Sequence, residues 1–320
     1  MFPYLFLLNL AFVIYWLLVK KKWIWLSVII MLMGSHHAMR SYAINFFPPK
    51  KQADDLKLMS YNVQLFGLYN WRNNTDIRDS IFDFLEREQP DVICFQEFFH
   101  SDETGYFETK TILKERLGLD YIHEEYTHLV KGVHRFGVAT MSRFPIIKSF
   151  PIRFDNDDSN VCIASDILYQ GDTLRIVNAH LSSIRLQDED YAFMEMKEMM
   201  EKEQAVRGAK RIYKLLRRAF RYRVSQTQTI VDVIEGSPHP LVFCADINDS
   251  PVSYSYQQFR NHLKDAHLIS GFGRGNTYIG NLPSFRIDYI FHDEELRSSG
   301  FTKHPEMLSD HHAISCYIGK

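Results

Sequence analysis

The chain contains the segment Leu241-Val242-Phe243-Cys244-Ala245-Asp246-Ile247-Asn248, in which five apolar residues lead directly into an acid and an amide. A short run that is apolar throughout predicts a β-strand buried on both faces. A buried strand gains nothing from Asp or Asn at its tip unless something binds there. A single polar tip is usually a cap or a turn, so the interpretation depends on whether the pattern recurs.

The same pattern occurs at five other places in the chain. Polar side chains end or begin apolar runs at Asn62, Gln96-Glu97, Asn178-Ala179-His180, Arg286-Ile287-Asp288 and Ser309-Asp310-His311. Carboxylates, carboxamides and histidines at successive strand ends can converge on one rim of a β-sandwich. Oxygen ligands with few thiols favour a hard cation such as Mg²⁺, Mn²⁺ or Ca²⁺. A hard cation beside histidines suits phosphoester hydrolysis, because the metal neutralises phosphoryl charge and a histidine transfers protons.

Strand-like and helical patterns alternate irregularly between these polar tips. Strand-like runs lie at 56–61, 92–96, 137–142, 161–169, 174–181, 241–245, 286–291 and 313–318. Helical patterns lie at 77–88, 106–117 and 226–234. Because the order of strands and helices is not regular, we expect an α+β fold in which helices cover two packed sheets. The segment 56–320 is then one domain.

The composition limits the function classes. The 320 residues carry a formal net charge of -2, so any attraction to phosphate must be local. Four cysteines in a chain of this length do not indicate a disulfide scaffold. Their spacing is not that of a structural zinc site either.

The N-terminal segment 1–45 differs from the rest of the chain. Residues 2–19 are almost uninterrupted apolar sequence, Lys20-Lys21-Lys22 follows, and a second apolar run covers 23–34. About 18 such residues can just cross a bilayer, so we expect a membrane anchor of one or two transmembrane helices. A secretory signal peptide is the main alternative, although no basic region precedes the apolar run. A linker at 46–55 separates the anchor from the domain. A cytoplasmic lysine turn would place that domain on the extracytoplasmic side.

A basic helical insertion is expected at 186–223. Its second half carries eight Lys and Arg residues beside an apolar stripe. Such a helix can lie on an anionic membrane surface or bind nucleic-acid phosphates. A solvated helix docked through its apolar stripe is an equal alternative.

The ordered set of motifs resembles the endonuclease/exonuclease/phosphatase superfamily, which is deoxyribonuclease I-like. The motifs are Ser60-Tyr-Asn-Val, Gln96-Glu97, the segment 137–145, Asn178-Ala-His-Leu, Ala245-Asp-Ile-Asn, Arg286-Ile-Asp-Tyr and Ser309-Asp-His-His. One such motif is weak evidence, whereas the set in family order is specific. The resemblance implies a four-layer α/β/β/α sandwich. The family carries Gly where this chain has Ala245, which implies a modest backbone adjustment.

The resemblance also implies roles for individual residues. The implied metal ligands, for Mg²⁺ or else Mn²⁺ or Ca²⁺, are Asn62, Glu97 and Asp310. The implied catalytic residues are His180, Asp246, Asn248, Asp288 and His311. Implied substrate contacts are Asn248, His180 and Thr277, the last in a loop that resembles one near the family's site.

The expected function is therefore metal-dependent hydrolysis of a phosphoester by a membrane-anchored enzyme. The substrate would be a lipid headgroup, an inositol phosphate or a nucleic acid, and no protein partner is implied. A nuclease and a non-catalytic membrane-anchored scaffold are the alternatives. The intact polar set argues against the scaffold, because a scaffold has no need of so many clustered acids.

Overall fold

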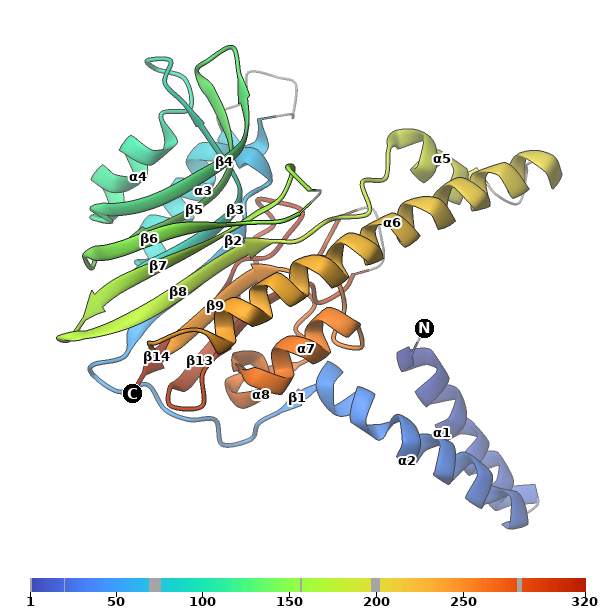
Figure 1. Cartoon of the computed structure of the whole chain (residues 1–320). Coiled ribbons are helices and arrows are strands. Elements are labelled where there is room, and N and C mark those ends of the chain that lie inside the picture. The colour runs from blue at the N-terminus through green and yellow to red at the C-terminus, as the bar shows by residue number, and fades with distance from the viewer. Residues whose placement is uncertain (1, 20, 69–75, 156, 197–201, 281–283) are drawn as a thin grey trace.

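Two six-stranded sheets form the centre of the computed structural model of the chain (Figure 1). The structure describes residues 2–19, 21–68, 76–155, 157–196, 202–280 and 284–320. The first sheet contains β2 (Leu56–Asn62), β3 (Val92–Ser101), β4 (Tyr121–Val130), β5 (His134–Ser142), β13 (Arg297–Lys303) and β14 (Ile314–Gly319). Its strand order is β13-β14-β2-β3-β5-β4.

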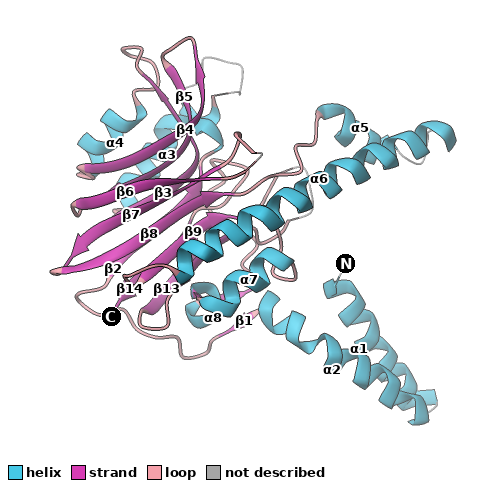
Figure 2. Ribbon diagram, in the orientation of Figure 1, coloured by secondary structure: helices cyan, strands magenta, loops and turns pink. Residues whose placement is uncertain are grey.

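The second sheet has the order β10-β12-β9-β8-β7-β6. Its strands are β6 (Ile146–Arg153), β7 (Val161–Tyr169), β8 (Asp172–His180), β9 (Leu241–Asp246), β10 (Lys264–Asp265) and β12 (Asp288–His292). Helices cover the outer faces of both sheets (Figure 2). The helices after β2 are α3 (Asp76–Glu88), α4 (Thr109–Leu117), α5 (Asp188–Met196), α6 (Lys202–Glu235), α7 (Tyr254–His262) and α8 (Ala266–Ser270), and of these α5 lies beside α6, away from the sheets. A short 3-10 helix, η2 (Gln64–Gly67), follows β2.

Three apolar layers hold these elements together. Buried residues of both sheets, such as Cys94 and Cys244, face each other between the sheets. The outer face of the first sheet packs on residues of α3 and α4 such as Ile81. The outer face of the second packs on α6 and α7 through Ile230 and Phe259. Strands covered on both faces read as continuous apolar runs, which is why the sequence revealed them. The predicted α/β/β/α sandwich is confirmed.

Four strands of the two six-stranded sheets were not predicted from the sequence, and all lie at the sheet edges. β4 and β6 are the last strands at one side of their sheets, and β13 and β10 are the last strands at the opposite sides. Most residues of β4 and β6 are exposed or half-buried. An edge strand faces solvent and tolerates charged residues, so it has no apolar run to mark it.

The N-terminal segment forms two helices, α1 (Phe2–Val19) and α2 (Ile24–Ser41), that pack against each other and extend away from the sandwich (Figure 1). The prediction that they cross a membrane is not supported: of the helices in the described residues, none has both the length and the apolar character that a bilayer crossing requires. The large apolar side chains of α1 are nevertheless exposed, among them Leu8 at 51% and Leu18 at 82%.

The end of α2 and the residues that follow it contact the domain. The short strand β1 (Ala43–Ile44) pairs with β11 (Phe272–Gly273). The buried Arg286 donates a hydrogen bond of 2.9 Å from Nη2 to the carbonyl oxygen of Arg40. Residues 46–55, all of them described, then run to β2 without helix or strand.

The part of the predicted basic segment from Lys202 onward and the helical pattern at 226–234 belong to one helix, α6, which has 34 residues and ends at Glu235. The first part of the predicted segment contains the separate helix α5. The segment between Gly208 and Glu235 contains neither Gly nor Pro, so nothing interrupts the helix. The C-terminal half of α6 packs on the second sheet, and the N-terminal half extends past the sheets beside α5 (Figure 1).

Candidate active site

The polar strand ends meet at one end of the sandwich because of the strand pairing. β2 and β3 are parallel neighbours, as are β8 and β9, so each pair ends at the same edge. This pairing sets Asn62 opposite Gln96 and His180 opposite Asp246. β12 runs antiparallel to β9, so its first residue, Asp288, also lies opposite Asp246.

Asp246 is the centre of this group. Its side chain is fully buried, and Oδ2 accepts a hydrogen bond of 3.0 Å from Nδ2 of Asn62. Oδ1 accepts a second, of 2.9 Å, from the backbone N–H of Asn248. Burial and the charge of Asp288 together raise the pKa of Asp246 above its ordinary value. The two hydrogen bonds fix the orientation of a carboxylate that its surroundings otherwise disfavour.

Asp288 and His311 form a buried hydrogen-bonded pair. Nδ1 of His311 lies 2.9 Å from Oδ2 of Asp288, and Nε2 lies 3.8 Å from Oδ2 of Asp246. Burial alone lowers the pKa of His311, but the carboxylates of Asp288 and Asp246 outweigh it and raise the pKa to about 10. His311 is therefore an imidazolium at neutral pH, held by one acid and directed at another.

Glu97 is turned toward the second sheet by a β-bulge. The register between β3 and β5 shifts between Phe95 and Phe98, and Glu97 has a left-handed φ of 49°. A bulge re-aims a side chain, and a non-glycine residue in this backbone region points to a functional constraint. Nε2 of His180 lies 3.8 Å from Oε1 of Glu97 and 3.6 Å from Oδ2 of Asp246. His180 thus links the acids of the two sheets.

Asp310 adds a further acid to the same group. Burial raises the pKa of Asp310, and the charges of Glu97 and Asp246 raise it further, while His311 opposes them. Carboxylates that disfavour one another's charge are stabilised by a divalent cation among them. The carboxylates of Glu97 and Asp310, the residues that the family resemblance implies as metal ligands, are a donor set that fits a hard metal ion.

His311 and Asn62 could also contribute to a metal site, but both are already hydrogen-bonded to other groups. Ligand atoms of Asp246, Asp288 and His311 lie within 4.8 Å of one another. However, Nδ1 of His311 is hydrogen-bonded to Asp288, and a protonated imidazole has no lone pair to offer a metal. Asn62, a predicted ligand, donates to Asp246 and accepts from the backbone N–H of Gln64 at 3.1 Å. In this structure Asn62 orients Asp246.

One cavity of about 340 Å³ joins most of the predicted residues. The predicted residues that line it are Glu97, Asp246, Asn248, Asp310 and His311. Two arginines, Arg185 and Arg223, line the same cavity. We call it the catalytic cavity. It combines carboxylates able to hold a cation with guanidinium groups able to hold an anion.

Thr277 is not placed as predicted. Its side chain is fully buried, and its hydroxyl accepts hydrogen bonds of 3.1 Å from the backbone N–H groups of Ile287 and Asp288. The prediction of a substrate contact is therefore not supported. Thr277 instead holds the backbone that presents Asp288 to His311.

Arg223 was not recognised as a site residue from the sequence. It was counted with the exposed basic residues of the 186–223 segment, yet its side chain is 2% exposed. Nε lies 3.2 Å from Oδ2 of Asp249, and Nη1 donates to the carbonyl oxygen of Ser182 at 2.9 Å. A periodicity marks it: with Ala219, Arg223 begins a row of buried positions on α6 that continues through Gln226 and Ile230.

A second unrecognised feature supports the site from beneath. Nε2 of Gln96 donates to Oδ1 of Asn178 at 2.8 Å, which connects the two sheets in the core. Nδ2 of Asn178 donates to the carbonyl oxygens of Ala139 and Phe95, at 3.0 Å and 3.2 Å. This buried network fixes the strands that carry Glu97 and His180. Buried amides are stable here because they are hydrogen-bonded.

Comparisons with known proteins agree with this geometry. A family model described as "Endonuclease/Exonuclease/phosphatase family" matches residues 59–311. A second family model, a domain of unknown function, matches residues 1–42. No curated protein matches the chain.

Solved structures share the fold at low sequence identity. The human Nocturnin catalytic domain with bound sulfate anion aligns with a TM-score of 0.60 and 19% identity, covering 86% of this chain and 99% of that one. Truncated Caenorhabditis elegans TDP2 aligns at 0.57 and 17%, covering 85% and 100%. A family protein from Leptotrichia buccalis aligns at 0.56 and 18%, covering 83% and 100%. At such identities the likeness extends to the fold alone.

Proposed function

Because this chain belongs to the endonuclease/exonuclease/phosphatase family, we propose that it is a divalent-metal-dependent phosphoester hydrolase. The observation that carries the proposal is the convergence of strand-end side chains from both sheets on one cavity. Glu97 and Asp310 fit a cation there, beside the Asp288–His311 pair and Asp246. A binding module would have no use for mutually repelling acids next to an oriented imidazolium.

The residues divide the chemistry between them. A divalent cation held by Glu97 and Asp310 would neutralise charge that develops on the phosphoryl oxygens. Asp246, fixed by Asn62 and the N–H of Asn248, orients the attacking water. The imidazolium of His311 offers a proton and a positive charge to the reacting phosphate.

His180 and the arginines complete the substrate site. His180 lies between Glu97 and Asp246 and contacts a phosphoryl or leaving oxygen. Arg223 and Arg185 line the cavity and provide positive charge for phosphate oxygens. Asn248, which also lines the cavity, contacts the phosphate.

Hydrolysis of bis(p-nitrophenyl) phosphate and p-nitrophenyl phosphate by the purified full-length chain tests the proposal. We expect turnover with Mg²⁺ or Mn²⁺, loss of turnover with EDTA, and a loss of about 1,000-fold or more in Asp246→Ala. A folded Asp246→Ala protein with wild-type turnover would remove Asp246 from the active site. A parallel panel of sphingophospholipid, inositol phosphate and plasmid DNA identifies the substrate class.

Nucleic acid is the alternative substrate. Its binding would weaken steeply with salt, because phosphate contacts release counterions. A lipid substrate would instead depend on its presentation in a bilayer. Turnover of plasmid DNA that falls by orders of magnitude between 50 and 200 mM salt, with no turnover of lipid, favours the nuclease.

We also propose that the protein binds a membrane through α1 and through the N-terminal half of α6, which extends past the sheets. The catalytic domain would lie on the extracytoplasmic side. Tyr213 and Phe220 are exposed on α6 at 64% and 48%. They share a shallow groove with Arg217 and Arg221. Rings among cationic side chains suit an anionic lipid surface.

Charge reversal of the α6 arginines tests the membrane proposal. The reversed residues are Arg217, Arg218 and Arg221. Reversal should lower activity on anionic vesicles and leave that on a soluble phosphodiester unchanged. Equal loss on both substrates would overturn the membrane proposal.

A further inference from the structure

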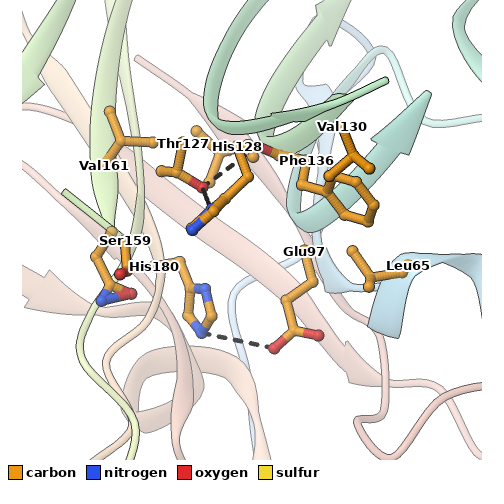
Figure 3. A pocket seen from close by; sticks show the side chains of 12 residues that line it. Leu65, Glu97, Thr127, His128, Val130, Phe136, Ser159, Val161 and His180 are labelled. Carbon is orange, nitrogen blue, oxygen red and sulfur yellow. Dashed lines mark hydrogen bonds and ion pairs between the residues drawn. The ribbon is translucent and has the colours of Figure 1, made fainter. Parts of the chain in front are cut away.

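A second cavity, of about 350 Å³, adjoins the catalytic cavity. Glu97 lines both cavities, and His180 lines the second and lies within 3.8 Å of Glu97. Figure 3 shows Glu97 and His180 on one side of this second cavity, with His128 and Phe136 across from them. A phosphate that sits against Glu97 and His180 therefore has this space beside it for one of its substituents. We call this second cavity the side cavity.

Apolar side chains line much of the side cavity, beside the polar side chains of Thr127, His128, Ser159 and Asn160. Val138 and Val161, 2% and 1% exposed, come from β5 of one sheet and β7 of the other. Leu65, Val130 and Phe136 add further apolar surface. Its volume falls within the range of about 300–1,000 Å³ that small-molecule sites occupy.

The charge around the side cavity differs from that of the catalytic cavity. Among the described residues that line the side cavity, none is Lys or Arg, whereas Arg185 and Arg223 line the catalytic cavity. A second phosphate in the side cavity would meet Glu97, with the imidazoles of His128 and His180 in place of a guanidinium or ammonium group. The side cavity is therefore a poor binding site for a polynucleotide, which carries a phosphate on every nucleotide.

Two backbone irregularities shape the side cavity. The bulge in β3 turns Glu97 to its boundary, and the register between β4 and β5 shifts between Tyr126 and His128. Oγ1 of Thr127, at that shift, donates to the carbonyl oxygen of Phe136 at 3.3 Å and lies 3.0 Å from Nδ1 of His128. Bulges next to an active site typically re-aim side chains, and here they open space between the two sheets.

From these observations we infer that the side cavity holds the apolar substituent of the phosphoester. The substrate class is then a phosphoester with one uncharged, largely hydrocarbon group on the side of His180 and Glu97. The inference rests on the proposed function and adds the substrate class to it. It favours an amphiphilic phosphoester over a polynucleotide.

Inhibition by alkylphosphonates of different chain length tests the inference. Their P–C bond resists hydrolysis, so methylphosphonate and hexylphosphonate report binding alone, through their Ki against bis(p-nitrophenyl) phosphate. Each buried methylene favours binding, so we expect hexylphosphonate to inhibit at least about 10-fold more strongly than methylphosphonate. Calorimetry with hexylphosphonate and Mg²⁺ measures the same difference without turnover.

Val130→Asp assigns the effect to the side cavity. Val130 is 45% exposed on β4, so the substitution is compatible with folding, and it places a charge at the cavity wall. It should reduce the preference for hexylphosphonate to less than about threefold. Leu129→Asp is the matched control, because Leu129 is its neighbour, is 56% exposed and does not line the cavity. It should leave the preference unchanged.

The outcomes separate the two proposals. Equal inhibition by both phosphonates, or a preference that survives Val130→Asp, would overturn the inference and leave the hydrolase intact. A preference lost equally in Leu129→Asp would overturn it too. If no phosphoester is hydrolysed with any cation, the proposed function fails, whereas calorimetric binding of hexylphosphonate that Val130→Asp abolishes still supports an apolar site here.

Discussion

Replacing Asp288 by Asn removes a negative charge from His311 while preserving the shape of the side chain. At 2.9 Å and an effective dielectric constant of about 20, the attraction between the two charges is about 6 kcal/mol, an upper limit for the effect. Without it the pKa of His311 falls from about 10 toward its ordinary value, and the ring loses the acceptor that orients it. We expect kcat/KM to fall by about 100- to 10,000-fold, or roughly 3–5.5 kcal/mol of barrier.

The assay is Mg²⁺-dependent hydrolysis of bis(p-nitrophenyl) phosphate between pH 5 and 9, with urea unfolding of each variant. Asp166→Asn is the matched control, because Asp166 is equally buried and pairs with Arg175 at 2.7 Å. Breaking either buried pair costs about 3–5 kcal/mol of stability, so the two variants should unfold alike. Only Asp288→Asn should lose activity. A folded Asp288→Asn protein that keeps more than about a third of wild-type kcat/KM refutes the role of the pair.

Three other measurements examine the metal, the core network and the pH response. Glu97→Gln should weaken Mn²⁺ binding by calorimetry about 100-fold or more, and unchanged binding would exclude Glu97 as a ligand. Asn178→Ala should lower the free energy of unfolding by about 2–4 kcal/mol, because buried hydrogen-bonding groups lose their partner; a loss below about 1 kcal/mol contradicts this. Burial lowers the pKa of His123 to about 4. Between pH 6.5 and 4 the unfolded chain therefore binds a proton that the folded chain does not, and the free energy of unfolding decreases as the pH is lowered. His123→Asn should make that fall shallower, measured by urea unfolding at pH 7 and 5, and an unchanged slope would show that His123 does not titrate as described.

Polar residues at strand ends made the grouping of most candidate site residues predictable from the sequence. Asp246 and His180 are local features of apolar runs, and the pairing of neighbouring strands then brings them together. Arg223 was not predictable in the same way, because its burial depends on which face of α6 packs against the second sheet. Thr277 is the converse: its motif suggested a substrate contact, but the hydroxyl serves backbone N–H groups that only the folded chain brings near.

The edge strands and the N-terminal helices show another limit of the sequence. β4 and β6 carry too many polar residues to be recognised, since only one neighbouring strand and one face constrain them. The apolar run at residues 2–19 correctly predicted a helix. Its length and composition suggested a bilayer crossing that the structure does not support. Apolarity alone does not specify which surface covers a helix.

The hydrogen bond from Arg286 to the carbonyl oxygen of Arg40 has a mechanical consequence. Arg286 stands two residues before Asp288 in the chain, and it also donates to the buried carboxylate of Asp265 at 2.7 Å. Swinging α2 about its C-terminal end would have to break a bond made by this buried guanidinium. The C-terminal end of α2 is therefore linked, through Arg286, to the segment that leads into β12 and Asp288.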